Sequence, residues 1–251
     1  MERLDGKKII ITGGTSGMGE GVVRAFPALG AKVVFWGRNT AAGEKIAQET
    51  GATFVKADVA DKASVDEAMK KSVELLGGVD VLIHAAGVGP HCPAEKISLD
   101  DWINTMSINA TGTFLTNEAV FPYMKENGGN ILNFTSASAF INSPGQAHYA
   151  ASKGAVNCWS RTIAKEWMQY NIRVNMIAPC IATPMYAQMR AMMTPEQLAA
   201  HDADMAKLCI GGKMGDMERD FVPVMAFMAS DGSRFMTGQT ISVDGGIMMV
   251  R

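Results

Sequence analysis

The chain has few cysteines, few aromatic residues and no excess of charge of either sign. Its 4 cysteines among 251 residues form no closely spaced pair, which excludes the usual disulfide frameworks and zinc-binding patterns. The 23 basic and 25 acidic residues leave a net charge of -2, so the charge balance predicts no nucleic-acid or anionic-membrane partner. No apolar run reaches the roughly 20 residues of a membrane span, and the first residues lack a signal-peptide pattern. We therefore expect a cytoplasmic protein without a metal site.

Apolar residues, in contrast, make up 47% of the chain, which is enough for a large core. Short apolar segments alternate with stretches of helical periodicity, including long ones over 99–126 and 147–169. This alternation predicts an α/β fold, a single Rossmann-type doubly wound parallel sheet of about seven strands with helices on both faces. We expect residues 1–251 to form one dinucleotide-binding and catalytic domain. The expected strands cover residues 8–12, 32–36, 53–55, 80–84, 130–134, 172–177 and 240–243.

A glycine-rich turn follows the first expected strand and opens a helix. It reads Thr12-Gly13-Gly14-Thr15-Ser16-Gly17-Met18-Gly19. Glycines allow a tight turn and the close approach of a pyrophosphate, and a helix N-terminus offers unpaired N–H groups to it. Such a turn alone is also typical of an ordinary strand–helix connection. Its place in an alternating chain favours nucleotide binding.

The spacing of this turn, TGxxxGxG, and a series of further motifs make the chain resemble the short-chain dehydrogenase/reductases of about this length. The further motifs are Asp58-Val59, His84-Ala85-Ala86-Gly87, Asn109, Ser136, Tyr149-x-x-x-Lys153, Ala178-Pro179 and Val243-Asp244-Gly245-Gly246. The resemblance implies reversible hydride transfer between a nicotinamide cofactor and a secondary alcohol or ketone. Two positions depart from the family pattern: His84 stands where asparagine is usual, and Cys180 where glycine is usual.

Tyr149 and Lys153 are the first candidates for catalysis. They are four residues apart in an expected helix, so their side chains share one face. A nearby ammonium lowers the pKa of a phenol and suits it to proton transfer, although a buried tyrosine beside a surface lysine has the same spacing. By resemblance, Tyr149 exchanges the proton and Ser136 orients the substrate oxygen. Lys153 then binds the nicotinamide ribose and lowers the pKa of Tyr149, and Asn109 completes a tetrad by holding a water near Lys153.

The second strand predicts which nicotinamide cofactor binds. NAD-specific folds place a carboxylate at the end of this strand, where it binds the ribose 2′-hydroxyl. That position is Gly37, and the following Arg38 can pair with a 2′-phosphate, although it can also be a solvated surface arginine. We expect NADP, with NAD as the alternative. The expected cofactor-binding residues are Gly13, Thr15, Ser16, Gly17, Met18, Gly19, Arg38, Asn39, Asp58, Val59, Ala85, Ala86, Gly87, Tyr149, Lys153, Pro179, Ile181 and Thr183.

Residues 183–217 are rich in methionine and alanine and interrupt the strand–helix rhythm. By resemblance, this segment lies over the substrate as a lid. Its methionines at helical spacing predict a surface that moulds to a large apolar ligand, although such a stripe also packs in protein cores. We therefore expect a bulky, apolar, cyclic alcohol or ketone of hydroxysteroid type. The expected substrate contacts are His91, Ser138, Met185 and Met189.

Three alternatives to this function stay open. Within the family, a 3-oxoacyl-carrier-protein reductase would need a basic docking surface for its acidic carrier. The segments 125–129 and 166–170, expected by resemblance to border the pocket mouth, carry one lysine against two glutamates, which disfavours a carrier. A catalytically silent dinucleotide-sensing regulator, and an epimerase or dehydratase relative, share the fold with other functions.

The resemblance also implies that copies of the chain associate. Family members pair their long helices and their C-terminal strands across two-fold interfaces. Here Phe114, Val120 and Phe121, together with the tail 247–250, offer apolar surface for such contacts. We expect a homotetramer, with a homodimer as the alternative.

Overall fold

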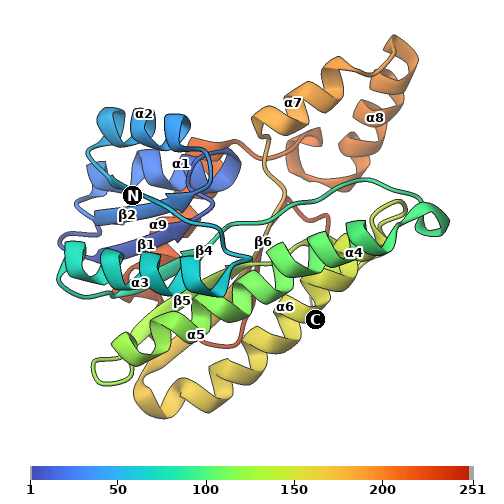
Figure 1. Cartoon of the computed structure of the whole chain (residues 1–251). Helices are drawn as coiled ribbons and strands as arrows, with labels where there is room; N and C mark the ends of the chain where they lie inside the picture. The colour runs from blue at the N-terminus through green and yellow to red at the C-terminus, as the bar shows by residue number, and fades with distance from the viewer. Residues whose placement is uncertain (1, 249–251) are drawn as a thin grey trace.

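The computed structural model describes residues 2–248, except for the side chain of Met185, and is built on one parallel sheet (Figure 1). The seven strands lie in the order β3-β2-β1-β4-β5-β6-β7, and every neighbouring pair is parallel. The expected α/β Rossmann-type fold is therefore confirmed. The strands are β1 (Lys8–Thr12), β2 (Lys32–Gly37), β3 (Thr53–Lys56), β4 (Val81–His84), β5 (Gly129–Phe134), β6 (Ile172–Pro179) and β7 (Thr240–Val243).

Helices cover both faces of the sheet (Figure 1). One face carries α1 (Gly17–Ala25), α2 (Thr40–Thr50) and α9 (Val222–Ala229), and the other carries α3 (Lys62–Leu76), α5 (Gly112–Met124) and α6 (Ala147–Trp167). Along β1, Ile9 and Ile11 pack toward the first group and Ile10 toward the second, because successive strand side chains point to opposite faces. This double cover explains why β1, β2 and β4 have continuous apolar runs.

The long helix expected over 99–126 is divided in the structure. It consists of α4 (Leu99–Met106), a π-helical turn at Ser107–Thr111, and α5. A π-turn admits an extra residue and changes the direction in which nearby side chains point. A second π-turn, Met217–Phe221, precedes α9. Short 3-10 turns lie at Pro27–Leu29, Ala94–Lys96, Ala137–Ala139, Met168–Tyr170, Ile210–Gly212 and Asp231–Ser233.

The segment after β6 forms two helices, α7 (Pro184–Ala191) and α8 (Pro195–Leu208), which project from the layered body (Figure 1). Each begins with a threonine N-cap followed by a proline, a sequence that favours helix initiation. Two side-chain contacts join the helices. Arg190 forms an ion pair with Asp202, and Tyr186 Oη lies 2.7 Å from His201 Nε2. Residues 183–217 thus form a braced helical arm.

The apolar residues expected at an interface between copies differ in their exposure. Phe114 is half-exposed, whereas Val120 is completely buried in the core between α5 and the sheet. The expectation for Val120 is therefore wrong, because its side of α5 packs against the chain's own strands. Phe121 is partly buried and packs on Trp167 at a ring separation of 4.6 Å. In the tail, Met248 is buried and residues 249–250 lie outside the described part.

Two further features of the described residues bear on function. No helix within residues 2–248 is long and apolar enough to cross a lipid bilayer. The same residues contain no group of three histidine, cysteine, aspartate or glutamate side chains placed to hold a metal ion.

Candidate active site

The candidate site lies at the carboxyl-terminal edge of the sheet. β1 leads into the glycine turn, β4 into Ala85–Gly87, and β5 into Ser136. Because all strands run the same way, these distant segments meet along one edge. β1 and β4 are also the strands where the order of the sheet reverses, the usual place for a ligand crevice in an open α/β sheet.

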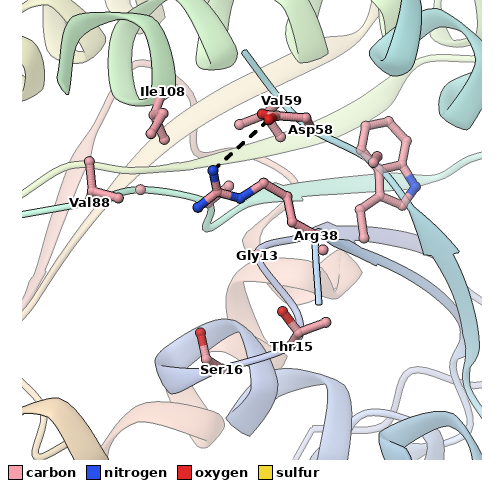
Figure 2. Close-up of a pocket in the computed structure, with 13 residues that line it drawn as sticks. Gly13, Thr15, Ser16, Arg38, Asp58, Val59, Val88 and Ile108 are labelled. Carbon is pink, nitrogen blue, oxygen red and sulfur yellow. Dashed lines mark ion pairs between the residues drawn. The ribbon is translucent and has the colours of Figure 1, made fainter. Parts of the chain in front are cut away.

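A cleft along this edge joins the glycine turn to the ends of β2 and β3 and to the turn after β4 (Figure 2). It contains many of the residues expected to bind the cofactor. The expected cofactor contacts did not include Trp36, Gly37, Ala57, Val88 and Ile108, although each is within two residues of an expected site residue. The full lining is Gly13, Thr15, Ser16, Trp36, Gly37, Arg38, Ala57, Asp58, Val59, Ala86, Gly87, Val88 and Ile108.

The glycine turn fits a pyrophosphate. A Cβ on Gly13 would lie 2.7 Å from the Ala86 backbone, and one on Gly19 would lie 2.3 Å from the Gly13 carbonyl oxygen. Gly17 has a φ of 58° and open space where a side chain would stand. Ser16, the N-cap of α1, makes no side-chain capping hydrogen bond, so the first N–H groups of this helix remain available to an anion. Room and donors are therefore both present for the phosphates of a dinucleotide.

Arg38 lies across the mouth of the cleft (Figure 2). Its side chain is 65% exposed, and its only ion pair among the described residues is a long one, 4.0 Å from Nη1 to Asp58 Oδ2. A Cβ on Gly37 would lie 2.4 Å from the side chain of Thr15, so a carboxylate at this position would collide with Thr15. The end of β2 thus has no room for an acidic side chain. It presents the Arg38 guanidinium, whose weak ion pair with Asp58 leaves it free to bind another anion.

Three residues expected to bind the cofactor have mainly local contacts. Met18 and Ala85 pack against the core on the α1 side of the sheet. Asn39 caps α2, since its Oδ1 accepts a hydrogen bond from the N–H of Ala42 at 3.1 Å. None of the three lines the cleft, and their roles toward a cofactor remain predictions.

Three more of the expected residues lie at or beyond the end of β6. Pro179 ends the strand, Ile181 is buried in the core, and Thr183 caps α7 by accepting a hydrogen bond from the N–H of Tyr186. Among them stands Cys180, and burial raises the pKa of its thiol to about 11, with Cys209 and Asp244 adding to the shift. Its thiolate is therefore scarce at neutral pH, which agrees with a packing role.

The structure brings Ser136, Tyr149 and Lys153 together. Tyr149 and Lys153 lie near the start of α6, and Lys153 Nζ is 5.9 Å from the centroid of the Tyr149 ring. Lys153 is only 4% exposed, and its Nζ donates a hydrogen bond of 2.8 Å to the carbonyl oxygen of Phe134 at the end of β5. The Ser136 side chain lies close enough to Tyr149 to lower the pKa of the phenol. A hydroxyl, a phenol and a buried ammonium therefore converge at the edge where β5 ends.

Burial sets the protonation states of this group. It raises the pKa of Tyr149, and the nearby Ser136 side chain offsets only part of the increase. Burial also lowers the pKa of Lys153 to about 8. The expected lowering of the Tyr149 pKa by Lys153 is thus not seen in the protein alone, because desolvation of the phenol dominates. At neutral pH, Tyr149 holds its proton and Lys153 is charged.

Asn109 braces the site from the π-helical turn. Its Oδ1 accepts a hydrogen bond from the N–H of Val88, and its Nδ2 donates to the Val88 carbonyl and to Ser152 Oγ, at 2.8, 2.8 and 2.9 Å. A Cβ on Gly87 would lie 3.2 Å from Asn109 Oδ1 and 3.3 Å from Lys153 Nζ, so both groups border the same small space. Asn109 therefore ties the loop after β4 to α6 beside Lys153.

His84, the departure from the family's asparagine, is a buried structural link. Its Nδ1 lies 3.1 Å from Thr12 Oγ1 and 2.9 Å from Thr116 Oγ1. Thr12 Oγ1 in turn accepts a hydrogen bond from the N–H of Ala86. Burial, aided by the charge of Lys153, lowers the pKa of His84 to about 3 and keeps the ring neutral. The link connects β1, β4 and α5 directly below the glycine turn.

Two of the expected substrate contacts, His91 and Ser138, lie in the segments that follow β4 and β5. His91 stands against Gly145, where a Cβ would lie 2.2 Å from the His91 ring. The N–H of Ser138 donates a hydrogen bond to Ser136 Oγ at 3.2 Å. Sequence reasoning missed Gly89, where a Cβ would lie 3.5 Å from the Tyr149 ring. A larger residue at this position would narrow the space beside the phenol.

The other two expected contacts, Met185 and Met189, are on α7. Met189 and the neighbouring Met192 are 41% and 84% exposed, so neither is a core residue. The side chain of Met185 lies outside the described part of the chain. The arm therefore presents methionine side chains to its surroundings.

The segments expected to border the pocket mouth lie elsewhere in this chain. Residues 125–129 precede β5 and residues 166–170 precede β6, whereas Ser136 follows β5. In a parallel sheet, segments that precede strands lie at the amino-terminal edge, opposite the site. That expectation is wrong, and their shortage of basic residues carries no argument about the substrate.

The buried lysine gives a first testable prediction. The pKa of Lys153 is about 8 in the folded chain, below its ordinary value of 10.5. Below pH 8 the buried ammonium is charged and destabilises the folded state fully. Between pH 8 and 10.5 the folded chain releases this proton while the unfolded chain keeps it, so the destabilisation decreases as the pH rises. Relative to Lys153→Met, the free energy of unfolding of the wild type should rise by roughly 2 kcal/mol between pH 7 and 10. Urea unfolding across this range measures it. Lys165→Met, an exposed lysine on the same helix, should show no such trend, and parallel curves for wild type and Lys153→Met would contradict the prediction.

Comparison with known proteins agrees with this geometry. A family model described as enoyl-(acyl carrier protein) reductase matches residues 13–248. A 3-oxoacyl-(acyl-carrier-protein) reductase of Chlamydia pneumoniae is 35% identical, over 97% of this chain and 98% of the relative. An enzyme of the same name from Thermotoga maritima is 34% identical, over 98% and 100%. A glucose 1-dehydrogenase of Gluconobacter oxydans is also 34% identical, over 99% and 94%. The chain therefore belongs to the short-chain dehydrogenase/reductase family of oxidoreductases.

Proposed function

We propose that this chain catalyses reversible hydride transfer between NADP and a secondary alcohol or ketone, with residues 1–251 acting as one dinucleotide-binding and catalytic domain. The observation that carries the proposal is the convergence of Ser136, Tyr149 and the buried Lys153 beside the cofactor cleft. A silent dinucleotide sensor would need the cleft but not a buried ammonium next to a phenol. Membership of an oxidoreductase family also favours net redox turnover over epimerisation or dehydration.

Each residue has a distinct task in this reaction. When bound, the nicotinamide supplies or accepts the hydride. Ser136 Oγ donates a hydrogen bond to the substrate oxygen, and Tyr149 Oη gives a proton to that oxygen or takes one from it. Lys153 Nζ spends one of its three N–H donors on Phe134, which leaves two for the ribose hydroxyls. Asn109 keeps the loop after β4 and α6 at a fixed separation around Lys153.

Replacement of the proton donor tests the catalytic assignment. Tyr149→Phe should lower kcat by roughly 10²–10⁴-fold, because it removes a positioned proton donor and leaves the ring in place. Cofactor affinity, measured by fluorescence titration, should stay near the wild-type value. Tyr123→Phe, on the exposed side of α5, is the matched control and should keep full activity. Near-normal turnover by Tyr149→Phe would refute the assignment.

The end of β2 supports NADP over NAD. Arg38→Ala should reduce kcat/KM for NADP by roughly 10- to 100-fold, since a charge-assisted hydrogen bond contributes about 1.5–3 kcal/mol. The value for NAD should change little. Thr15→Gly combined with Gly37→Asp makes room for a carboxylate and should shift the preference toward NAD, whereas Gly37→Asp alone should impair both cofactors. A wild-type preference for NAD that Arg38→Ala leaves unchanged would contradict the prediction.

For the substrate, we propose a bulky, apolar, cyclic alcohol or ketone of hydroxysteroid type, covered by residues 183–217 acting as a lid. Phe140 and Ile141, which follow Ser136 closely, are half-exposed, as is Met189 on α7. Exposed apolar side chains near a catalytic group favour an apolar ligand, and methionines adapt to its shape. Closure of the arm over such a ligand would keep water away from the hydride transfer.

A carrier-bound 3-oxoacyl group is the second candidate substrate. Two of the relatives carry the name of a reductase for such substrates, at an identity close to that of the glucose 1-dehydrogenase. Similarity of this level therefore supports more than one substrate class.

A substrate panel separates the two candidates. A ring-ketone steroid, a small cyclic ketone and an acetoacetyl thioester are compared by the decrease in NADPH absorbance. We expect the steroid to have a kcat/KM at least roughly tenfold above that of the thioester, and Met189→Gln to reduce it. Met168→Gln, a similarly exposed methionine outside the arm, is the control. Turnover of the thioester alone would establish the second candidate.

We also propose that the protein acts in the cytoplasm as a homotetramer, or as a homodimer. Its four cysteines are free, which suits a reducing compartment. Phe114 on α5 and Trp102 on α4 are half-exposed aromatic side chains on the helices that family resemblance places between copies.

A further inference from the structure

The loop that follows β4 passes from the cofactor cleft to the phenol of Tyr149. Val88 lines the cleft (Figure 2), and the next residue, Gly89, is exposed and lies beside the Tyr149 ring. A Cβ on Gly89 would lie 3.5, 3.6 and 3.7 Å from Cε2, Cδ2 and Cζ of this ring. Cζ is the carbon that carries the hydroxyl group. The missing side chain therefore leaves a space along the ring that reaches its proton-donating end.

Contacts on both sides of Gly89 hold the loop in place. The N–H and the carbonyl oxygen of Val88 both form hydrogen bonds with the Asn109 side chain, each at 2.8 Å. Further along the loop, the N–H of Cys92 donates a hydrogen bond of 2.7 Å to the carbonyl oxygen of Gly145, in the segment that leads into α6. The backbone at position 89 is thus fixed relative to the phenol, and the space between them has a defined size.

Backbone geometry does not explain why position 89 is a glycine. The φ of Gly89 is not positive, so any L-residue fits its conformation. A Cβ would also meet the Tyr149 ring only at ordinary van der Waals distances, in contrast to Gly13, where it would lie 2.7 Å from the Ala86 backbone. The fold therefore tolerates a side chain at this position, and the space that the glycine leaves is open to a ligand.

We propose that Gly89 determines substrate specificity by leaving room for a branch or a fused ring on the carbon next to the carbonyl group of the ketone. This inference rests on the proposed reaction, in which Tyr149 Oη meets the substrate oxygen. A ketone oxygen that accepts this hydrogen bond has its carbonyl carbon roughly 3.5 Å from Oη. A ring fused beside the carbonyl group then extends into the space at Gly89. A linear 3-oxoacyl chain has no branch on either neighbouring carbon and does not need this space.

Two isomeric ketones of equal size test the assignment. The second ring of 1-decalone begins on the carbon next to the carbonyl group, whereas that of 2-decalone begins one carbon further away. For each ketone we would measure kcat/KM with NADPH, and the affinity by calorimetric titration of the protein–NADP complex. In Gly89→Val, the preference for 1-decalone over 2-decalone should fall by roughly tenfold or more, because one methylene in an apolar pocket changes selectivity about 10- to 200-fold. Gly89→Ala should give an intermediate preference, since its Cβ only touches the ring.

Two controls separate selection by size from general damage. Gly154→Val adds the same side chain on α6, where a Cβ would have no neighbour within 4 Å, and should leave the preference between the two ketones unchanged. The affinity of Gly89→Val for NADP alone should equal that of the wild type, because Gly89 is not part of the lining of the cofactor cleft.

Several outcomes would overturn the proposal. An unchanged preference in Gly89→Val would show that position 89 does not meet the substrate. An equal loss for both ketones would show that the new side chain disturbs Tyr149 and does not select by shape. Absence of 1-decalone binding by the wild type would mean that the space is not a ligand site. If both ketones bind but neither is reduced, the proposed reaction is wrong, and the ratio of affinities still decides whether Gly89 selects the ligand.

Discussion

The burial of one ammonium group, that of Lys153, is the constraint on which the candidate site depends. A buried charge is costly unless polar groups around it stabilise it, and burial accordingly lowers the pKa of Lys153 to about 8. One N–H group is satisfied by the carbonyl oxygen of Phe134 at the end of β5. The remaining donors need partners that a protein interior rarely supplies, which is why a polar ligand suits this position. The same burial raises the pKa of Tyr149, so its proton is retained at neutral pH and is available for transfer to a substrate oxygen.

Polar contacts around Lys153 hold together the loop after β4, the π-helical turn before α5, and the start of α6. Asn109 in the π-helical turn holds the loop after β4 against α6 through Val88 and Ser152. His84 connects β1, β4 and α5 through the hydroxyls of Thr12 and Thr116. Thr116 and Thr113 donate successive hydrogen bonds that connect His84 to Asn109. Because Thr12 is also the first residue of the glycine turn, this turn and the surroundings of Lys153 share one buried network. The glycine turn and the Lys153 site are therefore held at a fixed separation before any ligand binds.

Much of this arrangement could be predicted from local patterns. Apolar runs located all seven strands to within about two residues, and the spacing of Tyr149 and Lys153 placed both on one helical face. The π-turn at Asn109 escaped prediction because one added residue barely changes the apolar periodicity. The steric conflict between Thr15 and a side chain at position 37 could not be predicted, because these residues are 22 positions apart and come into contact only in the folded chain. The direction of the Tyr149 pKa shift likewise depends on burial, which a four-residue spacing does not reveal. Val120 and the segments before β5 and β6 lie away from their expected places. Which side of α5 faces the sheet, and which edge a connecting segment occupies, depend on the packing of this chain and not on family resemblance.

The proposed reaction is the transfer of a hydride from NADPH, bound at this edge of the sheet, to the carbonyl carbon of a ketone. It is tested most directly by incubating the protein with a cyclic ketone and reduced NADP that carries deuterium at both hydrogen positions of nicotinamide C4, followed by mass spectrometry of the product. The account predicts an alcohol with one deuterium on its carbinol carbon, formed by the wild type and almost lost in Tyr149→Phe. Recovery of the ketone unchanged, or formation of an alcohol without deuterium from this doubly labelled cofactor, would contradict it.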